Sequence, residues 1–191
     1  MRVTQCAWVL GVLCGFSAAQ MVSNGIEHFA LRDDGLAIRR NAEAGKPFTV
    51  AGQQGVIVGR QEGVFEAWLL PVKLLSNLRL EAEVDGYPVP IDLNAHAAGI
   101  EVFPDRTVIT YAHIALTVKQ IMFAPDETED GTGAVVLFEI DAVRPMQLTL
   151  RFTPEMRPMW PEPSQGIPSA EWVTRGASGF YVLHTDFPNL A

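Results

Sequence analysis

Residues 78–86 read LRLEAEVDG, and this stretch decides the fold class because apolar and charged side chains alternate strictly along it. The apolar side chains share one face of an extended chain: Leu78, Leu80, Ala82 and Val84. A repeat of two is typical of a strand with one buried face, so we predict that these four side chains point inward. The Asp-Gly pair at 85–86 then predicts a turn, with residues 87–93 returning as the partner strand.

The same strand signal recurs on both sides of this stretch. It is found at residues 114–123, 134–140 and 146–152, and turn residues stand at 34–35, 104–105 and 130–133. Beyond residue 30 no segment has a helical period of useful length. Many short strands without long helices between them predict an all-β fold, an antiparallel β-sandwich of two packed sheets.

A proline-rich stretch follows the last of these strands, where residues 151–163 read RFTPEMRPMWPEP. Four prolines in thirteen residues predict that regular structure ends after Phe152, because proline fixes φ and has no backbone donor. Met159 and Trp160 lie on this stiffened loop. They are interpreted first as a plug of the core or of a domain contact, and second as a sugar-binding pair, since an aromatic face packs well on a sugar ring.

Composition fits one packed domain. The chain has 191 residues, of which 48% are hydrophobic and 19% are charged, so it can bury a sizeable core. Its formal net charge of −8 gives no electrostatic basis for binding a phosphate backbone. Nucleic acid is therefore not an expected partner.

The first twenty residues, MRVTQCAWVLGVLCGFSAAQ, resemble an export signal in their order. Arg2 precedes an apolar run at 6–16, and the small residues at 17–19 form a cleavage site. We therefore predict a signal peptide at 1–19 and a β-sandwich domain at 20–191, in the periplasm or outside the cell, with no membrane attachment after cleavage. A buried helix or an uncleaved anchor is the alternative.

Motifs for cofactor or nucleophilic chemistry are missing from the sequence. It contains no nucleophile elbow, P-loop, dinucleotide-binding glycine pattern or His-Glu-x-x-His, and cleavage would remove both cysteines. The acidic run at 126–130 is interpreted as a solvated hairpin loop rather than a calcium site. The four histidines, His28, His96, His113 and His184, are interpreted as structural. No cofactor and no metal are expected.

Glu66 is the single charge in the apolar run GVFEAWLLP at 63–71. A carboxyl group removed from water keeps its proton more readily, which suits the general acid of a glycosidase. The other interpretation is structural: Glu66 pairs with an arginine across strands, or lies beside Trp68 on a half-exposed face. We prefer the structural interpretation because no second acid has a comparably apolar setting, with Glu139 the nearest.

Three segments together resemble a known family: GVFEAWLLPVKLLSNLRLEAEVDG at 63–86, RFTPEMRPMWP at 151–161 and GFYVLHTD at 179–186. They are similar to the amino-terminal β-sandwich domain of exported bacterial six-hairpin glycosidases, the glycogen-debranching or amylo-α-1,6-glucosidase-like class. The resemblance extends from residue 27 to the end. In such enzymes an α/α toroid follows the sandwich and supplies the acid and base carboxylates. The resemblance implies that this chain stops before the toroid and carries no catalytic pair.

The expected function follows from this resemblance. The chain is expected to be the non-catalytic sandwich domain of an exported glycoside hydrolase acting on α-glucan or related oligosaccharides. Its expected partners are the C-terminal catalytic domain of the same polypeptide and an oligosaccharide contacting Met159 and Trp160. Two alternatives stay open: a stand-alone carbohydrate-binding sandwich, and a glycosidase complete in this chain that uses Glu66 with Asp92 or Glu101.

Overall fold

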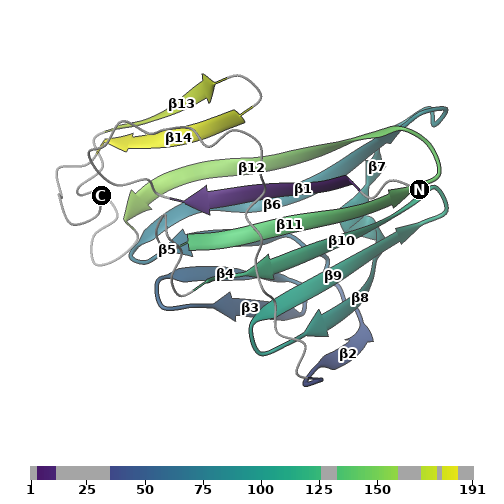
Figure 1. Ribbon diagram of the computed structural model, residues 1–191, viewed down its shortest axis with the longest axis horizontal. Coiled ribbons are helices and arrows are strands. Elements are labelled where there is room, and N and C mark those ends of the chain that lie inside the picture. The colour runs from purple at the N-terminus through teal and green to yellow at the C-terminus, as the bar shows by residue number, and fades with distance from the viewer. Residues whose placement is uncertain (1–3, 12–34, 126–132, 159–168, 176–177, 185–191) are drawn as a thin grey trace.

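The computed structural model describes residues 4–11, 35–125, 133–158, 169–175 and 178–184, and it shows two packed antiparallel sheets (Figure 1). The first sheet has the order β1 (Thr4–Gly11), β11 (Gly133–Ala142), β10 (Leu116–Phe123), β9 (Arg106–His113), β8 (Ala97–Val102) and β2 (Ile38–Asn41). The second has the order β12 (Met146–Pro158), β6 (Val72–Val84), β5 (Phe65–Leu69), β4 (Gly55–Arg60) and β3 (Pro47–Ala51).

Three short elements complete the described chain. The two-residue strand β7 (Ile91–Asp92) pairs with β6, and the 3₁₀ helix η1 (Leu93–His96) follows it directly. Strands β13 (Ser169–Arg175) and β14 (Ser178–His184) form a separate hairpin. No α-helix occurs in these ranges, and the predicted all-β sandwich is confirmed.

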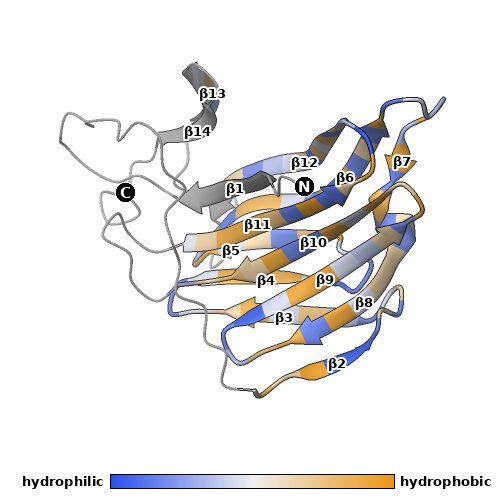
Figure 2. Cartoon of the chain, turned by 45° about the vertical axis from the view of Figure 1, so that its right-hand side comes forward, coloured by the Kyte–Doolittle hydropathy of each residue, from blue (hydrophilic) through white to orange (hydrophobic). Residues whose placement is uncertain are grey.

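The core lies between the two sheets and contains the predicted face of β6. The side chains of Leu78, Leu80, Ala82 and Val84 are each at most 5% exposed, whereas Arg79 and Glu83 between them are exposed. Figure 2 shows the same alternation of hydrophobic and hydrophilic residues along the strands. The first sheet contributes its own inward side chains, among them Ile109, Tyr111, Val118 and Phe138. Because burying one large apolar side chain contributes about 1.5–3 kcal/mol, this contact stabilises the sandwich.

One part of the first sheet is apolar on both faces. Ala134 and Val136 of β11 pack into the main core, while Val135 between them belongs to a second cluster with Ile121 and Phe123 of β10. Both alternate sets of side chains are buried here, so the run at 134–138 is continuous rather than alternating. A strict repeat of two therefore does not describe this strand.

The predicted return strand at 87–93 is wrong in extent. Only Ile91 and Asp92 pair with β6, because Pro88 and Pro90 cannot donate to a ladder. The long partner of β6 is β12, whose pairing runs in register from Met146 opposite Val84.

The prediction that regular structure ends after Phe152 is also wrong. Strand β12 continues to Pro158 with two register shifts opposite β6, and Met156 at the second has φ of 47°. Among the described strands β12 is at the edge of its sheet, where a missing N–H costs no ladder bond on the open side. Met156 is buried, as its apolar side chain suggests.

Buried polar side chains connect the β4–β5 turn to the rest of the core. The Tyr111 hydroxyl donates to Gln120 Oε1 at 2.7 Å, and both side chains are fully buried. Burial, with the charge of Glu62 as a lesser cause, raises the pKa of Tyr111 above its usual value. Asn94 accepts from the Leu80 N–H and donates to the Glu62 carbonyl, each at 2.8 Å. The Asn94 bonds hold the turn that contains Gly63 against β6, and the Tyr111 hydroxyl of the first sheet packs directly over Gly63.

The segment predicted as an export signal lies partly in the first sheet. Strand β1 pairs antiparallel with β11, from Thr4 opposite Ile140 to Gly11 opposite Gly133. Cleavage after Ala19 would remove β1 and leave β11 at the edge, so the two roles exclude each other in one mature protein. In the described ranges, no helix has the length and apolar character needed to cross a bilayer.

We expect the exported protein to begin at Gln20, because a charged start, a short apolar run and a small-residue site precede it. Amino-terminal sequencing and intact-mass measurement of the secreted protein check this. Material that keeps residues 1–19 would instead assign Thr4–Gly11 to the mature first sheet.

Candidate functional site

Among the described residues, histidine and acidic side chains do not gather into a metal site. In the described ranges, no three His, Cys, Asp or Glu side chains are grouped closely enough to hold an ion. His96 and His113 meet edge to face at 4.9 Å between ring centroids, and His113 Nδ1 accepts the Ala115 N–H at 3.2 Å. The acidic run at 126–130 and His28 lie outside the described residues, as does the side chain of His184.

Glu66 lies on the outer face of the second sheet, in contact with two partners. Its carboxylate forms an ion pair with Lys73 Nζ at 2.5 Å and accepts from Trp68 Nε1 at 3.0 Å. The Lys73 ammonium also lies 5.2 Å from the centre of the Trp68 ring. The position beside Trp68 agrees with the structural interpretation, but the cation is a lysine and not the expected arginine.

This arrangement does not resemble a catalytic pair. A glycosidase needs a protonated acid and a second carboxyl group about 5–9.5 Å away. The Glu66 carboxylate is instead occupied by an ion pair with Lys73 and a hydrogen bond from Trp68. Glu101 is on β8 of the other sheet, bound to Arg39 at 2.8 Å, and Asp92 caps η1 by accepting the Asn94 N–H. Among the described contacts, neither Glu101 nor Asp92 touches Glu66.

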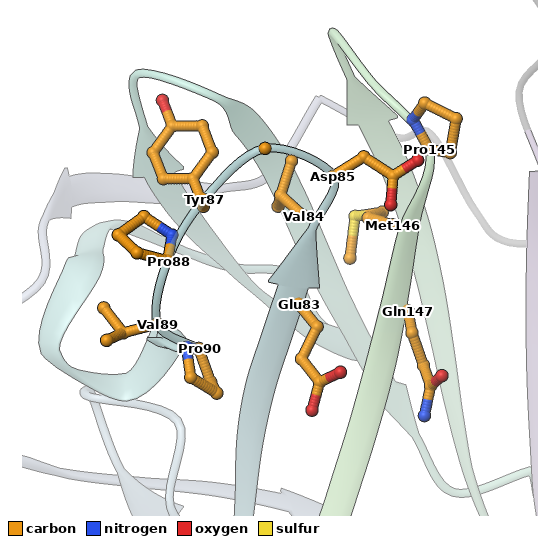
Figure 3. Close-up of a pocket in the computed structure, with 11 residues that line it drawn as sticks. Glu83, Val84, Asp85, Tyr87, Pro88, Val89, Pro90, Pro145, Met146 and Gln147 are labelled. Atoms are coloured by element: carbon orange, nitrogen blue, oxygen red, sulfur yellow. The ribbon is translucent and has the colours of Figure 1, made fainter.

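An open hollow of about 610 Å³ lies at one end of the sandwich (Figure 3). It is lined by the β6–β7 loop and the turn that joins β11 to β12: Glu83, Val84, Asp85, Gly86, Tyr87, Pro88, Val89, Pro90, Pro145, Met146 and Gln147. Backbone bonds hold these loops together, because the Asp85 N–H donates to the Pro145 carbonyl at 3.0 Å. Arg144 Nη1 donates to the Asp85 carbonyl at 3.2 Å.

Three polar side chains at the hollow are available to bind solvent or a ligand. Among the described residues, the carboxylates of Glu83 and Asp85 and the Gln147 amide make no hydrogen bond or ion pair. Glu81, two residues before Glu83 on the same face of β6, forms an ion pair with Arg151 at 3.2 Å. Glu83 thus differs from Glu66 and Glu81, the paired carboxylates of the same outer face.

Apolar side chains are exposed beside the hollow. Tyr87 and Val89 line it, and Val143 and Ile114 project from the neighbouring β11–β12 and β9–β10 turns, with Ile114 87% exposed. The Tyr87 ring meets His113 edge to face at 5.7 Å, and the Val143 N–H donates to the Ala115 carbonyl. Exposed apolar groups gathered on contacting loops are typical of an interaction surface.

Sequence reasoning did not find this hollow. Met159 and Trp160, the residues expected to contact sugar, lie outside the described residues, so that expectation stays a prediction. Trp172 is exposed on β13. The alternating prolines at 88 and 90, taken as part of a strand, were the available signal for a stiff surface loop.

Comparisons with known proteins found no matching family model, curated protein or solved structure.

Proposed function

We propose that this chain is the non-catalytic amino-terminal β-sandwich domain of an exported glycoside hydrolase that acts on α-glucan or related oligosaccharides. The catalytic carboxylates belong to an α/α toroid that follows in the same polypeptide. Two things support the proposal: the resemblance at 63–86, 151–161 and 179–186, and a fold of the kind which that resemblance implies.

The environment of Glu66 is the observation that carries the non-catalytic part of the proposal. This glutamate was the one acid in a strongly apolar run, and it is held by Lys73 and Trp68 on an outer sheet face. A carboxylate paired with an ammonium group and an indole N–H is suited to joining β5 to β6, and no second carboxyl group is in contact with it in the described structure.

A stand-alone carbohydrate-binding sandwich is the second candidate, and the hollow favours it. Tyr87 and three unpaired polar side chains gather there. A row of tryptophans is not formed in the described structure, because Trp68 is on β5 and Trp172 is on the separate β13–β14 hairpin. Neither candidate is catalytic in this chain, so a hydrolysis assay tests both of them against a glycosidase that uses Glu66.

We expect residues 20–191 to hydrolyse no glycoside, with or without Glu66. Purified protein and its Glu66→Gln variant are assayed on α-glucan oligosaccharides and aryl glycosides, with thermal unfolding measured in parallel. Because Glu66 is one-third exposed, at 32%, losing its ion pair should cost only about 1 kcal/mol.

Glu81→Gln is the matched control, since Glu81 is 29% exposed on the same face and also pairs with a basic residue, Arg151. Turnover in the parent and in Glu81→Gln, lost in Glu66→Gln at an unchanged melting temperature, would make Glu66 catalytic and refute the proposal.

A further inference from the structure

We propose that the hollow at the β6–β7 loop is a carbohydrate-binding subsite that takes the end of a neutral oligosaccharide. The identification of that sugar as an α-glucan rests on the proposed function, whereas the site itself rests on the residues that line it. A volume of about 610 Å³ lies within the range of about 300–1,000 Å³ for small-molecule sites.

The apolar wall of the hollow is held in place before any ligand arrives. Pro88 and Pro90 fix two φ angles of the loop, and the Tyr87 N–H is bonded to the Val84 carbonyl at 3.0 Å. The contact with His113 restrains the Tyr87 ring from the side of the first sheet. A restrained aromatic side chain loses little entropy on binding, which favours stacking against the C–H face of a sugar.

The polar wall supplies acceptors for hydroxyl groups. Glu83 and Gln147 are cross-strand partners on β6 and β12, and Figure 3 shows their side chains projecting side by side. Asp85 adds a second carboxylate at the turn. Carboxylate and amide groups placed next to each other can accept from adjacent sugar hydroxyls, and bonds to charged acceptors are the stronger ones.

Charge and shape together favour a neutral sugar over an ion. Two unpaired carboxylates repel phosphorylated or acidic sugars. A basic peptide would find its ion pairs fully open to water, where each contributes only about 0–1 kcal/mol. A neutral sugar uses both walls, because it presents an apolar ring face and several hydroxyl groups at once.

The test is a titration of the purified full chain with maltooligosaccharides and a panel of other neutral oligosaccharides, followed by calorimetry and by backbone amide chemical shifts. We expect binding to shift amides in 83–90 and 145–147. Tyr87→Ala should weaken affinity at least tenfold, and Gln147→Ala should weaken it severalfold. Trp172→Ala, which shortens an exposed aromatic on the β13–β14 hairpin, should leave affinity unchanged.

Each outcome has one meaning for the site. Binding of a different neutral sugar at the hollow supports the site and removes the α-glucan assignment. No binding of any sugar, or binding that Tyr87→Ala and Gln147→Ala leave unchanged in folded protein, overturns the site. Oligolysine binding that is lost in Glu83→Gln, without sugar binding, overturns it in favour of a cationic partner. The hydrolysis assay above is independent of all these results.

Discussion

Replacing Gly63 by alanine is expected to lower the free energy of unfolding by roughly 3 kcal/mol or more. Gly63 is buried with φ of 87°, a conformation that costs an L residue about 1–2 kcal/mol. A Cβ at this position would also overlap the Tyr111 hydroxyl. That ring cannot move freely, because it is fully buried and bonded to Gln120, so the overlap threatens a buried hydrogen bond as well.

Urea unfolding of the parent and of Gly63→Ala measures this loss. Gly45→Ala is the matched control, since Gly45 has φ of 82° but nothing within 4 Å of an added Cβ. It should cost only the conformational part, about 1 kcal/mol. Equal losses in the two variants would show that Tyr111 does not close over Gly63 as described.

Asn94→Ala is expected to lower the free energy of unfolding by roughly 2–4 kcal/mol. The substitution removes the buried bond from the Leu80 N–H and the half-buried bond to the Glu62 carbonyl. An unpaired backbone group away from water costs about 1–3 kcal/mol, which applies in full to the Leu80 N–H and in part to the Glu62 carbonyl. The β6 ladder and the β4–β5 turn should therefore loosen together.

Chemical denaturation with amide hydrogen exchange measures this effect, and the Leu80 amide should lose protection first. Asn41→Ala serves as control, because Asn41 is exposed on β2 and its loss should change stability by no more than about 0.5 kcal/mol. A similar result for both asparagines would contradict the role given to Asn94.

The sequence was sufficient where a strand has one buried face. The alternation at 78–84 placed Leu78 and Leu80 inward, and the strand at 146–152 was expected where β12 begins. It failed where the outcome depends on the neighbouring strand. Whether Pro154 ends a strand depends on the direction in which its missing N–H would point, and only the order of strands in the sheet determines that.

The same limit applies to the sites. Glu66 was expected beside Trp68, and a hairpin turning at 70–71 would have placed Lys73 opposite Trp68, as the structure does. The hollow could not be predicted from the sequence, because it brings Glu83 next to Gln147 across more than sixty residues of chain. Such a long-range pairing leaves no local pattern in one sequence.

We propose that this sandwich belongs to a longer glycoside hydrolase whose catalytic carboxylates lie elsewhere in the polypeptide. The direct measurement is the intact mass and peptide sequence of the native protein, captured from its source with an antibody raised against residues 35–125. We predict a polypeptide that continues well past Ala191 into a segment of paired helices, and that hydrolyses α-glucan or a related oligosaccharide. A native polypeptide that ends at Ala191 would contradict the account.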